Sequence, residues 1–259
     1  MKSREKSLSG SKRAIQGVTE ILKPLLEMVY PAICLICDSA QTKNSSPICE
    51  QCWEKLETLR LDSKIRLSDI LTPESSGTNH AEATTRHDFP IYALGIYQSP
   101  LLEMIHEFKY NGFERLGIEL SRELIRLKRS SLERLKADAL VPVPLHSSAL
   151  RRRGFNQALT VSDTISRAFE IEVCPMAVSR VKKTKDQTKL SADQRLANIS
   201  GAFQLNGDFL EGKRVILVDD VITSGATISE LARVALLGGA SIAGAVTLAV
   251  SHRYGERTR

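Results

Sequence analysis

The pattern of apolar and polar positions changes near residue 89. From there on, short apolar runs suited to strands alternate with amphipathic stretches of helical spacing. The runs are IYALGIY (91–97), ADALVPVPL (137–145), RVILVDD (214–220) and SIAGAVTLAV (241–250). The prolines of the second run confine it to a sheet edge or to the last residues of a strand. RVILVDD, in contrast, is apolar enough to be buried on both faces.

The stretches between these runs predict helices. One covers 99–110, with Ser99 as its cap and Pro100 as its first residue. Others cover 114 to about 127, 156–169, and 226–240, where Gly238 and Gly239 stop the helix. Strands separated by helices predict an α/β fold with a mostly parallel sheet and helices on both faces. Ligands of such sheets bind at the carboxyl ends of the strands.

The chain before residue 89 has a different character. Residues 1–30 combine a basic, Ser-rich tail with a short amphipathic helix, and 31–60 contain four cysteines and a second short helix over 53–59. Residues 61–88 are polar and lack a period, so we interpret them as a linker. The main domain is then expected over 89–252, followed by a tail at 253–259.

The four N-terminal cysteines form two CxxC pairs, Cys34 with Cys37 and Cys49 with Cys52, separated by eleven residues. This spacing is typical of a tetrahedral zinc site, and four thiolates close the shell of a structural ion. The alternative is a set of unrelated buried or redox thiols. Cys174 has no partner nearby in sequence and is interpreted as a buried thiol.

Composition and charge narrow the class of protein only modestly. The chain has 259 residues, 42% of them hydrophobic, and a formal net charge of +6. The excess positive charge favours an anionic partner, either a phosphorylated small molecule or a nucleic acid. No apolar run approaches the roughly 18 residues of a membrane span, and no signal peptide is recognisable, so a cytoplasmic location is expected.

The stretch VILVDDVITSGAT (215–227) contains the most specific chemistry. Val215–Val218 is expected to be a central strand, with Asp219 and Asp220 at its carboxyl end. The residues that follow would open the next helix, where free amides, hydroxyls and the helix dipole favour a phosphate: Thr223, Ser224, Gly225, Ala226 and Thr227. Two carboxylates beside this loop would repel a phosphate, but they accept hydrogen bonds from vicinal hydroxyls. The pattern therefore indicates ribose 5-phosphate recognition, the alternative for the acidic pair alone being a solvated turn.

This stretch resembles the signature of the type I phosphoribosyltransferases, which bind phosphoribosyl pyrophosphate. VPVPLHSSALRRRGFNQA (141–158) and RVKKTKDQTKLSADQRLANISGAF (180–203) resemble the two hallmark segments of the ComF family of competence-associated phosphoribosyltransferase-like proteins. The four-cysteine N-terminus matches that family too. The resemblance implies a type I phosphoribosyltransferase fold with a small N-terminal zinc module held by four cysteines.

The resemblance also implies roles for particular residues. The segment after 141–145 corresponds to the pyrophosphate side of the pocket, where we expect Arg151, Arg153, Asn156 and Gln157 to bind; for Arg152 a basic solvated turn is an equal alternative. Segment 180–198 corresponds to a mobile lid whose Lys182, Lys185 and Gln187 would face the ligand. Mg²⁺ would bridge pyrophosphate and ribose oxygens beside Asp219 and Asp220. The implied reaction is displacement of pyrophosphate from ribose C1 by an unidentified nitrogen acceptor.

Two other functions stay open. One is a non-catalytic factor that handles single-stranded DNA during natural transformation, beside a competence helicase. Its sequence support is weak, because Phe155 is the only aromatic residue within the two basic clusters. The other is a regulator that binds phosphoribosyl pyrophosphate as a signal and a partner protein through the zinc module.

Overall fold

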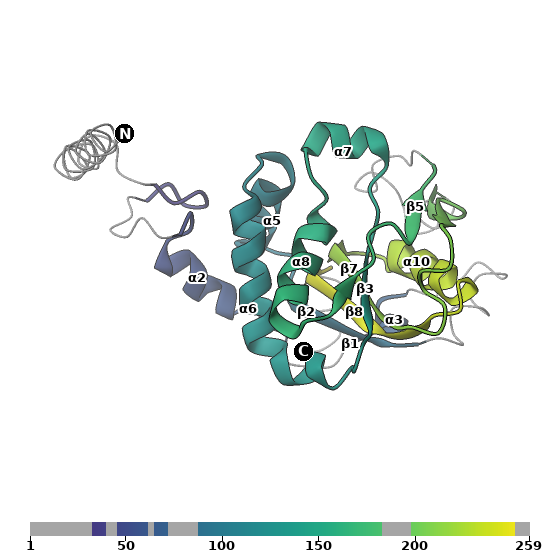
Figure 1. Ribbon diagram of the computed structural model, residues 1–259. Coiled ribbons are helices and arrows are strands. Elements are labelled where there is room, and N and C mark those ends of the chain that lie inside the picture. Colours follow the sequence, from purple (N-terminus) through teal and green to yellow (C-terminus); the bar gives the residue numbers. More distant parts are fainter. Residues whose placement is uncertain (1–32, 40–45, 62–64, 72–87, 183–197, 252–259) are drawn as a thin grey trace, which may run out of the picture. The chain divides into compact units, whose positions relative to one another are not determined.

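A central sheet organises the larger part of the computed structural model, in the strand order β1-β2-β8-β7-β3-β4 (Figure 1). The structure describes residues 33–39, 46–61, 65–71, 88–182 and 198–251. The chain divides into two compact units between Trp53 and Glu54, and the sheet belongs entirely to the second unit. Neighbouring strands are parallel, except that β1 runs antiparallel to β2. The expected mostly parallel α/β fold is therefore confirmed.

Four strands of this sheet, β2, β3, β7 and β8, lie close to the apolar runs of the sequence. Its strands are β1 (Ile65–Arg66), β2 (Pro90–Ile96), β3 (Ala139–Pro142), β4 (Glu172–Val173), β7 (Arg214–Ile222) and β8 (Ser241–Val250). A separate two-stranded sheet pairs β5 (Val178–Arg180) with β6 (Phe203–Leu205). As expected, β7 is central in the sheet. β3 is the neighbour of the edge strand β4, and a proline is the last residue of β3.

The helices cover the sheet on two sides, as Figure 1 shows for α5, α6 and α8 on one side and α10 on the other. Their bounds are α2 (Glu50–Glu57), α3 (Leu67–Ile70), α5 (Leu101–Tyr110), α6 (Glu114–Glu133), α7 (Ser147–Arg153), α8 (Gln157–Phe169) and α10 (Ala226–Leu237). The apolar stripe of α5 is fully buried at Leu101, Met104, Ile105 and Phe108. Among the described residues, none of the helices has the length and apolar composition that a membrane crossing requires.

Several element boundaries differ from the sequence expectation. Pro100, not Ser99, occupies the N-cap of α5, and no side chain caps that end. α6 continues about six residues past 127 because Leu132 still packs into the core. α2 begins at Glu50, inside the second CxxC pair. The sequence missed α7, β4, β5, β6 and two elements within the segment interpreted as a linker, β1 and α3. The helix expected within 14–30 lies outside the described residues.

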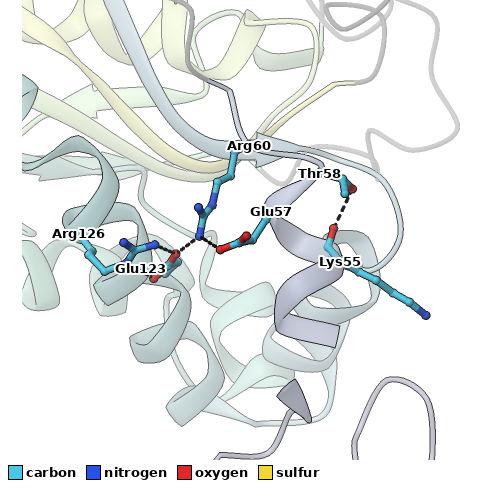
Figure 2. A network of polar contacts seen from close by, with 6 residues as sticks. All are labelled: Lys55, Glu57, Thr58, Arg60, Glu123 and Arg126. Carbon is cyan, nitrogen blue, oxygen red and sulfur yellow. Dashed lines mark hydrogen bonds and ion pairs between the residues drawn. The ribbon is translucent and has the colours of Figure 1, made fainter. Parts of the chain in front are cut away.

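Charged side chains join the segment after α2 to the middle of α6 (Figure 2). The Arg60 guanidinium lies 2.7 Å from Glu123 Oε1 and 2.8 Å from Glu57 Oε1. Arg126 holds the same Glu123 carboxylate through two nitrogens, at 2.6 and 2.8 Å. Hydrogen bonding by Arg126, followed by the positive charges of Arg126 and Arg60, lowers the pKa of Glu123 against the opposing effect of burial. Glu123 is therefore the shared acceptor that ties residues 57–60 to α6.

Candidate functional site

The acidic pair lies within β7 rather than after its end. The expected end at Val218 is wrong, because the ladder with β8 continues through Asp219 opposite Thr247 to Ile222 opposite Val250. Successive residues of a strand point to opposite faces of the sheet. The two side chains therefore leave the strand in different directions, although Lys109 acts electrostatically on both carboxylates.

Asp220 is paired with a lysine that the sequence reasoning missed. Lys109 Nζ, at the end of α5, lies 2.9 Å from Asp220 Oδ1, and the two side chains are only 14% and 11% exposed. Burial opposes the charge on Lys109, yet the carboxylates of Asp220 and Asp219 raise the pKa of Lys109 above its ordinary value. Tyr97, just past β2, interacts electrostatically with both members of this pair, and burial raises its pKa. The pair is thus a protected ion pair.

Among the described residues, no ion pair involves Asp219. Its Oδ1 accepts a hydrogen bond from the Asp220 N–H at 2.8 Å. Burial, followed by the negative charge of Asp220, raises the pKa of Asp219 to about 7, against the opposing effects of Lys109, that N–H group and Arg180. Near neutral pH, Asp219 is therefore able to take up or release a proton.

The expected phosphate loop connects β7 to α10. Thr223, Ser224 and Gly225 form a bend after Ile222, and α10 begins at Ala226. Gly225 is the N-cap with φ 74°, a left-handed conformation that favours glycine. A Cβ there would lie 3.2 Å from Leu71 and 3.3 Å from Leu67, so α3 and the residue after it form one wall of the loop. Gly225 has no side chain of its own to cap α10, which suits a loop whose amides bind an external anion.

Arg153 and Gln157 flank the turn between α7 and α8. The Arg153 guanidinium donates to Gln157 Oε1 at 3.0 Å and stacks over the Tyr110 ring at 5.1 Å. Arg153 Nε and Gln157 Nε2 are both buried, and neither has a hydrogen-bond partner among the described residues. Buried donors without partners are costly, so two of them side by side indicate a site that an acceptor-rich ligand completes.

The other residues expected on this side have different surroundings. Asn156 is the N-cap of α8: its Oδ1 accepts from the Ala158 N–H and its Nδ2 donates to the Val143 carbonyl. Arg151 and Arg152 are exposed on α7, which stands away from the sheet in Figure 1. Asn156 thus positions the turn through its own bonds, whereas Arg151 is placed on the outer surface.

The segment expected to be a lid begins at β5. Arg180 is mostly buried and lies over the Phe203 ring at 5.7 Å. Burial lowers the pKa of Arg180, the charge of Asp219 opposes this shift, and Arg153 adds to it. Arg180 is therefore close enough to both Asp219 and Arg153 to feel the charge of each. Lys182 donates to the Ser200 carbonyl at 2.8 Å, and Lys185 and Gln187 lie outside the described residues.

The additional residues of this site are Lys109, Tyr97, Tyr110 and Arg180. One signal in the sequence could have identified Lys109. It follows Leu101 and Ile105 at spacings of four residues, so it lies on the buried stripe of α5 rather than on the solvent face. A lysine on such a stripe requires a buried partner for its charge, and that partner is usually a carboxylate.

The N-terminal unit brings its four cysteines together. The Sγ atoms of Cys34, Cys37, Cys49 and Cys52 all lie within 4.8 Å of one another. The Cys49 N–H points to Cys34 Sγ at 3.3 Å. Hydrogen bonding to Ser39 lowers the pKa of Cys37 to about 6, which favours the thiolate that a metal requires. Four thiol ligands at this separation fit a structural Zn²⁺ ion and leave no position for a substrate.

Comparisons with known proteins agree with both parts of the chain. Residues 150–259 match the phosphoribosyl transferase domain, and residues 25–63 match the double zinc ribbon domain. The fold and the acidic pair thus belong to the class of phosphoribosyltransferase-like proteins. The combination of this domain with a zinc ribbon agrees with the resemblance to the ComF family.

Named relatives support this assignment. The chain is 34% identical over 149 residues to the DNA utilization protein YhgH of Escherichia coli, covering 56% of this chain and 65% of that protein. It is 37% identical over 145 residues to competence protein F of Haemophilus influenzae, covering 54% and 63%. Competence protein ComFC of Bacillus subtilis is 25% identical over 235 residues, covering 82% and 91%. The match thus spans slightly less than two thirds of the first two relatives.

Proposed function

We propose that the site around β7 binds phosphoribosyl pyrophosphate with Mg²⁺ and transfers the phosphoribosyl group to a nitrogen acceptor. The observation that carries the proposal is the placement of two carboxylates near the end of β7, with the glycine-capped N-terminus of α10 a few residues further on. The loop amides would bind the 5-phosphate, and Asp219 and Asp220 would accept from the ribose hydroxyls. Carboxylate and hydroxyl oxygens are also the ligands that Mg²⁺ prefers.

The pyrophosphate would lie toward Arg153 and Gln157. Their unpartnered N–H groups supply donors that pyrophosphate oxygens satisfy. In the transfer step, the bond from ribose C1 to a pyrophosphate oxygen breaks as the lone pair of the acceptor nitrogen forms the new bond. Positive charge at Arg153 and Arg180 would stabilise the departing pyrophosphate, and bound Mg²⁺ would neutralise part of its charge.

The proposal is tested by calorimetric titration of the zinc-loaded protein with phosphoribosyl pyrophosphate and Mg²⁺. We expect micromolar binding to the wild type, on the order of 8 kcal/mol, and its loss in the Asp219→Asn, Asp220→Asn double variant. Asp138→Asn is the matched control, because Asp138 accepts from the Arg214 N–H at the other end of β7. If the double variant binds as tightly as the control, the acidic pair is not the ribose site. Binding without turnover over a panel of nitrogen acceptors would leave a ligand-sensing role.

A second proposed function is the handling of single-stranded DNA, favoured by the relatives named for competence and DNA utilization. One structural observation adds to it. Tyr110 is 47% exposed and contacts Arg153, with His106 4.6 Å from its ring, so an aromatic residue does accompany a basic one. Tyr110→Ala should weaken binding of an oligothymidine, whereas Asp219→Asn, Asp220→Asn should not. If neither variant affects a salt-dependent affinity, this surface is not involved. A competence helicase as partner and a cytoplasmic location belong to the same proposal.

A further inference from the structure

A ligand that carries several phosphates meets an electrostatic obstacle at β7. Asp219 and Asp220 place two carboxyl groups near the end of β7, shortly before the loop into α10, and like charges at such short range repel strongly where water is scarce. The neutral hydroxyls of a ribose tolerate these carboxylates, but the phosphates on either side of the ribose do not. The site therefore needs cations that come from outside the loop.

Lys109 is placed to supply one of them. Its ammonium group contacts Asp220 at 2.9 Å, and both side chains are nearly enclosed. The other groups that act on Lys109 are Asp219 and Tyr97. Unlike the pairs on the surface of α6, such as Arg129 with Glu133, this pair joins different elements, α5 and β7. Because it is shielded from solvent, salt screens it little.

We infer that Lys109 is a positioning residue that neutralises the charge of Asp220. The acidic pair can then hold ribose hydroxyls while a diphosphate lies beside it; this inference rests on the proposed function. Lys109 acts through Asp220 and needs no contact with the ligand. Its ammonium has three donors, of which Asp220 uses one, and it fixes the orientation of that carboxylate. Without Lys109, Asp220 would be a nearly buried, unpaired negative charge facing an anionic ligand.

The test uses inorganic pyrophosphate with Mg²⁺ as the probe, because pyrophosphate has no hydroxyls for Asp220 to recognise. Calorimetry on the full, zinc-loaded chain compares the wild type with Lys109→Met, Lys109→Arg and the double variant Lys109→Met, Asp220→Asn. Lys213→Met is the matched control: Lys213 lies 2.7 Å from Glu172, just before β7 and far along the strand from the acidic pair. Thermal unfolding of each variant identifies any that fails to fold.

Charge neutralisation makes a specific set of predictions. Lys109→Met should weaken pyrophosphate binding about tenfold or more, and Lys109→Arg should retain most of the affinity. The double variant should bind pyrophosphate clearly more tightly than Lys109→Met alone, because removing the charge of Asp220 restores the balance. Lys213→Met should bind like the wild type.

Three results overturn the inference. If the Lys109→Met variant binds pyrophosphate like the wild type, the charge of Lys109 does not affect anion binding. A double variant as weak as Lys109→Met shows that Lys109 contacts the diphosphate itself or only supports the fold. A wild type that binds no pyrophosphate shows that the site takes no such anion. Failure of the proposed function has a different signature. In that case the wild type binds pyrophosphate, but it binds phosphoribosyl pyrophosphate no more tightly than pyrophosphate alone.

Discussion

Gly117 of α6 offers a sharp test of how α5 is held, and α5 is the helix that carries Lys109. A Cβ at Gly117 would lie 2.2 Å from Phe108 Cε2 and 2.3 Å from Cζ, well inside contact distance. Alanine would favour the helix by about 1 kcal/mol, whereas overpacking of a core costs about 1–3 kcal/mol. Phe108 is fully buried and its ring packs against Phe155 at 5.5 Å, so it has little room to move. We expect Gly117→Ala to lower the free energy of unfolding by up to about 2 kcal/mol in net.

Urea denaturation of a double-mutant cycle measures this contact. Phe108→Leu alone should destabilise the protein, because it leaves a cavity. In combination with Gly117→Ala, however, the shorter side chain gives the new methyl group space, so the cost of the pair should be about 1 kcal/mol less than the sum of the single costs. Additive costs, or a stabilised Gly117→Ala protein, would refute the reasoning that the Phe108 ring excludes a side chain at 117.

Three further predictions follow from the same structure. The folded protein keeps a proton on Asp219 up to about pH 7, whereas the unfolded chain releases it near pH 4. The free energy of unfolding should therefore fall as pH rises between these values, by a few kcal/mol at most. Asp219→Asn should flatten this fall in urea titrations at pH 5 and 8. Glu123→Gln should lower the free energy of unfolding, measured by heat or urea, by about 1–2 kcal/mol, because two guanidinium groups share the Glu123 carboxylate. Glu133→Gln on the exposed face of α6 is the control and should cost at most about 0.5 kcal/mol. Equal costs would contradict the network of Figure 2. Metal analysis should find about one zinc per chain, lost in Cys34→Ser and kept in Cys174→Ser, and equal zinc in both variants would place the ion elsewhere.

The long strands and helices could be predicted from sequence because each has a local signal. β8 matches its expected range, which an unbroken apolar run predicts. α10 begins at 226 as expected and ends at Leu237, just before the two glycines that were expected to stop it. The missed elements lack such signals. β4, β5 and β6 have only two or three residues each, and their pairing with distant strands defines them. α7 has no buried residue, so no apolar stripe identifies it.

The extent of β7 illustrates the same limit. The apolar run ends at Val218, and a carboxylate usually signals the end of a buried strand. Here β8 is long enough to pair as far as Ile222, and Lys109 compensates the charge that would otherwise exclude Asp220 from a nearly buried position. Both causes come from other segments, so the local sequence could not contain them.

The candidate site divides in the same way. Its anionic and phosphate-binding part is contiguous in the chain, from Asp219 to Thr227, and could therefore be recognised as a motif. Its cationic part is assembled from three separate elements: Lys109 from α5, Arg153 from α7 and Arg180 from β5. Only Arg153 was expected as a ligand residue. Because a polyanion can approach two carboxylates only where cations balance them, these dispersed residues decide whether the recognisable motif binds phosphoribosyl pyrophosphate, and substitutions at Lys109 and Arg180 test that point more directly than substitutions within the motif.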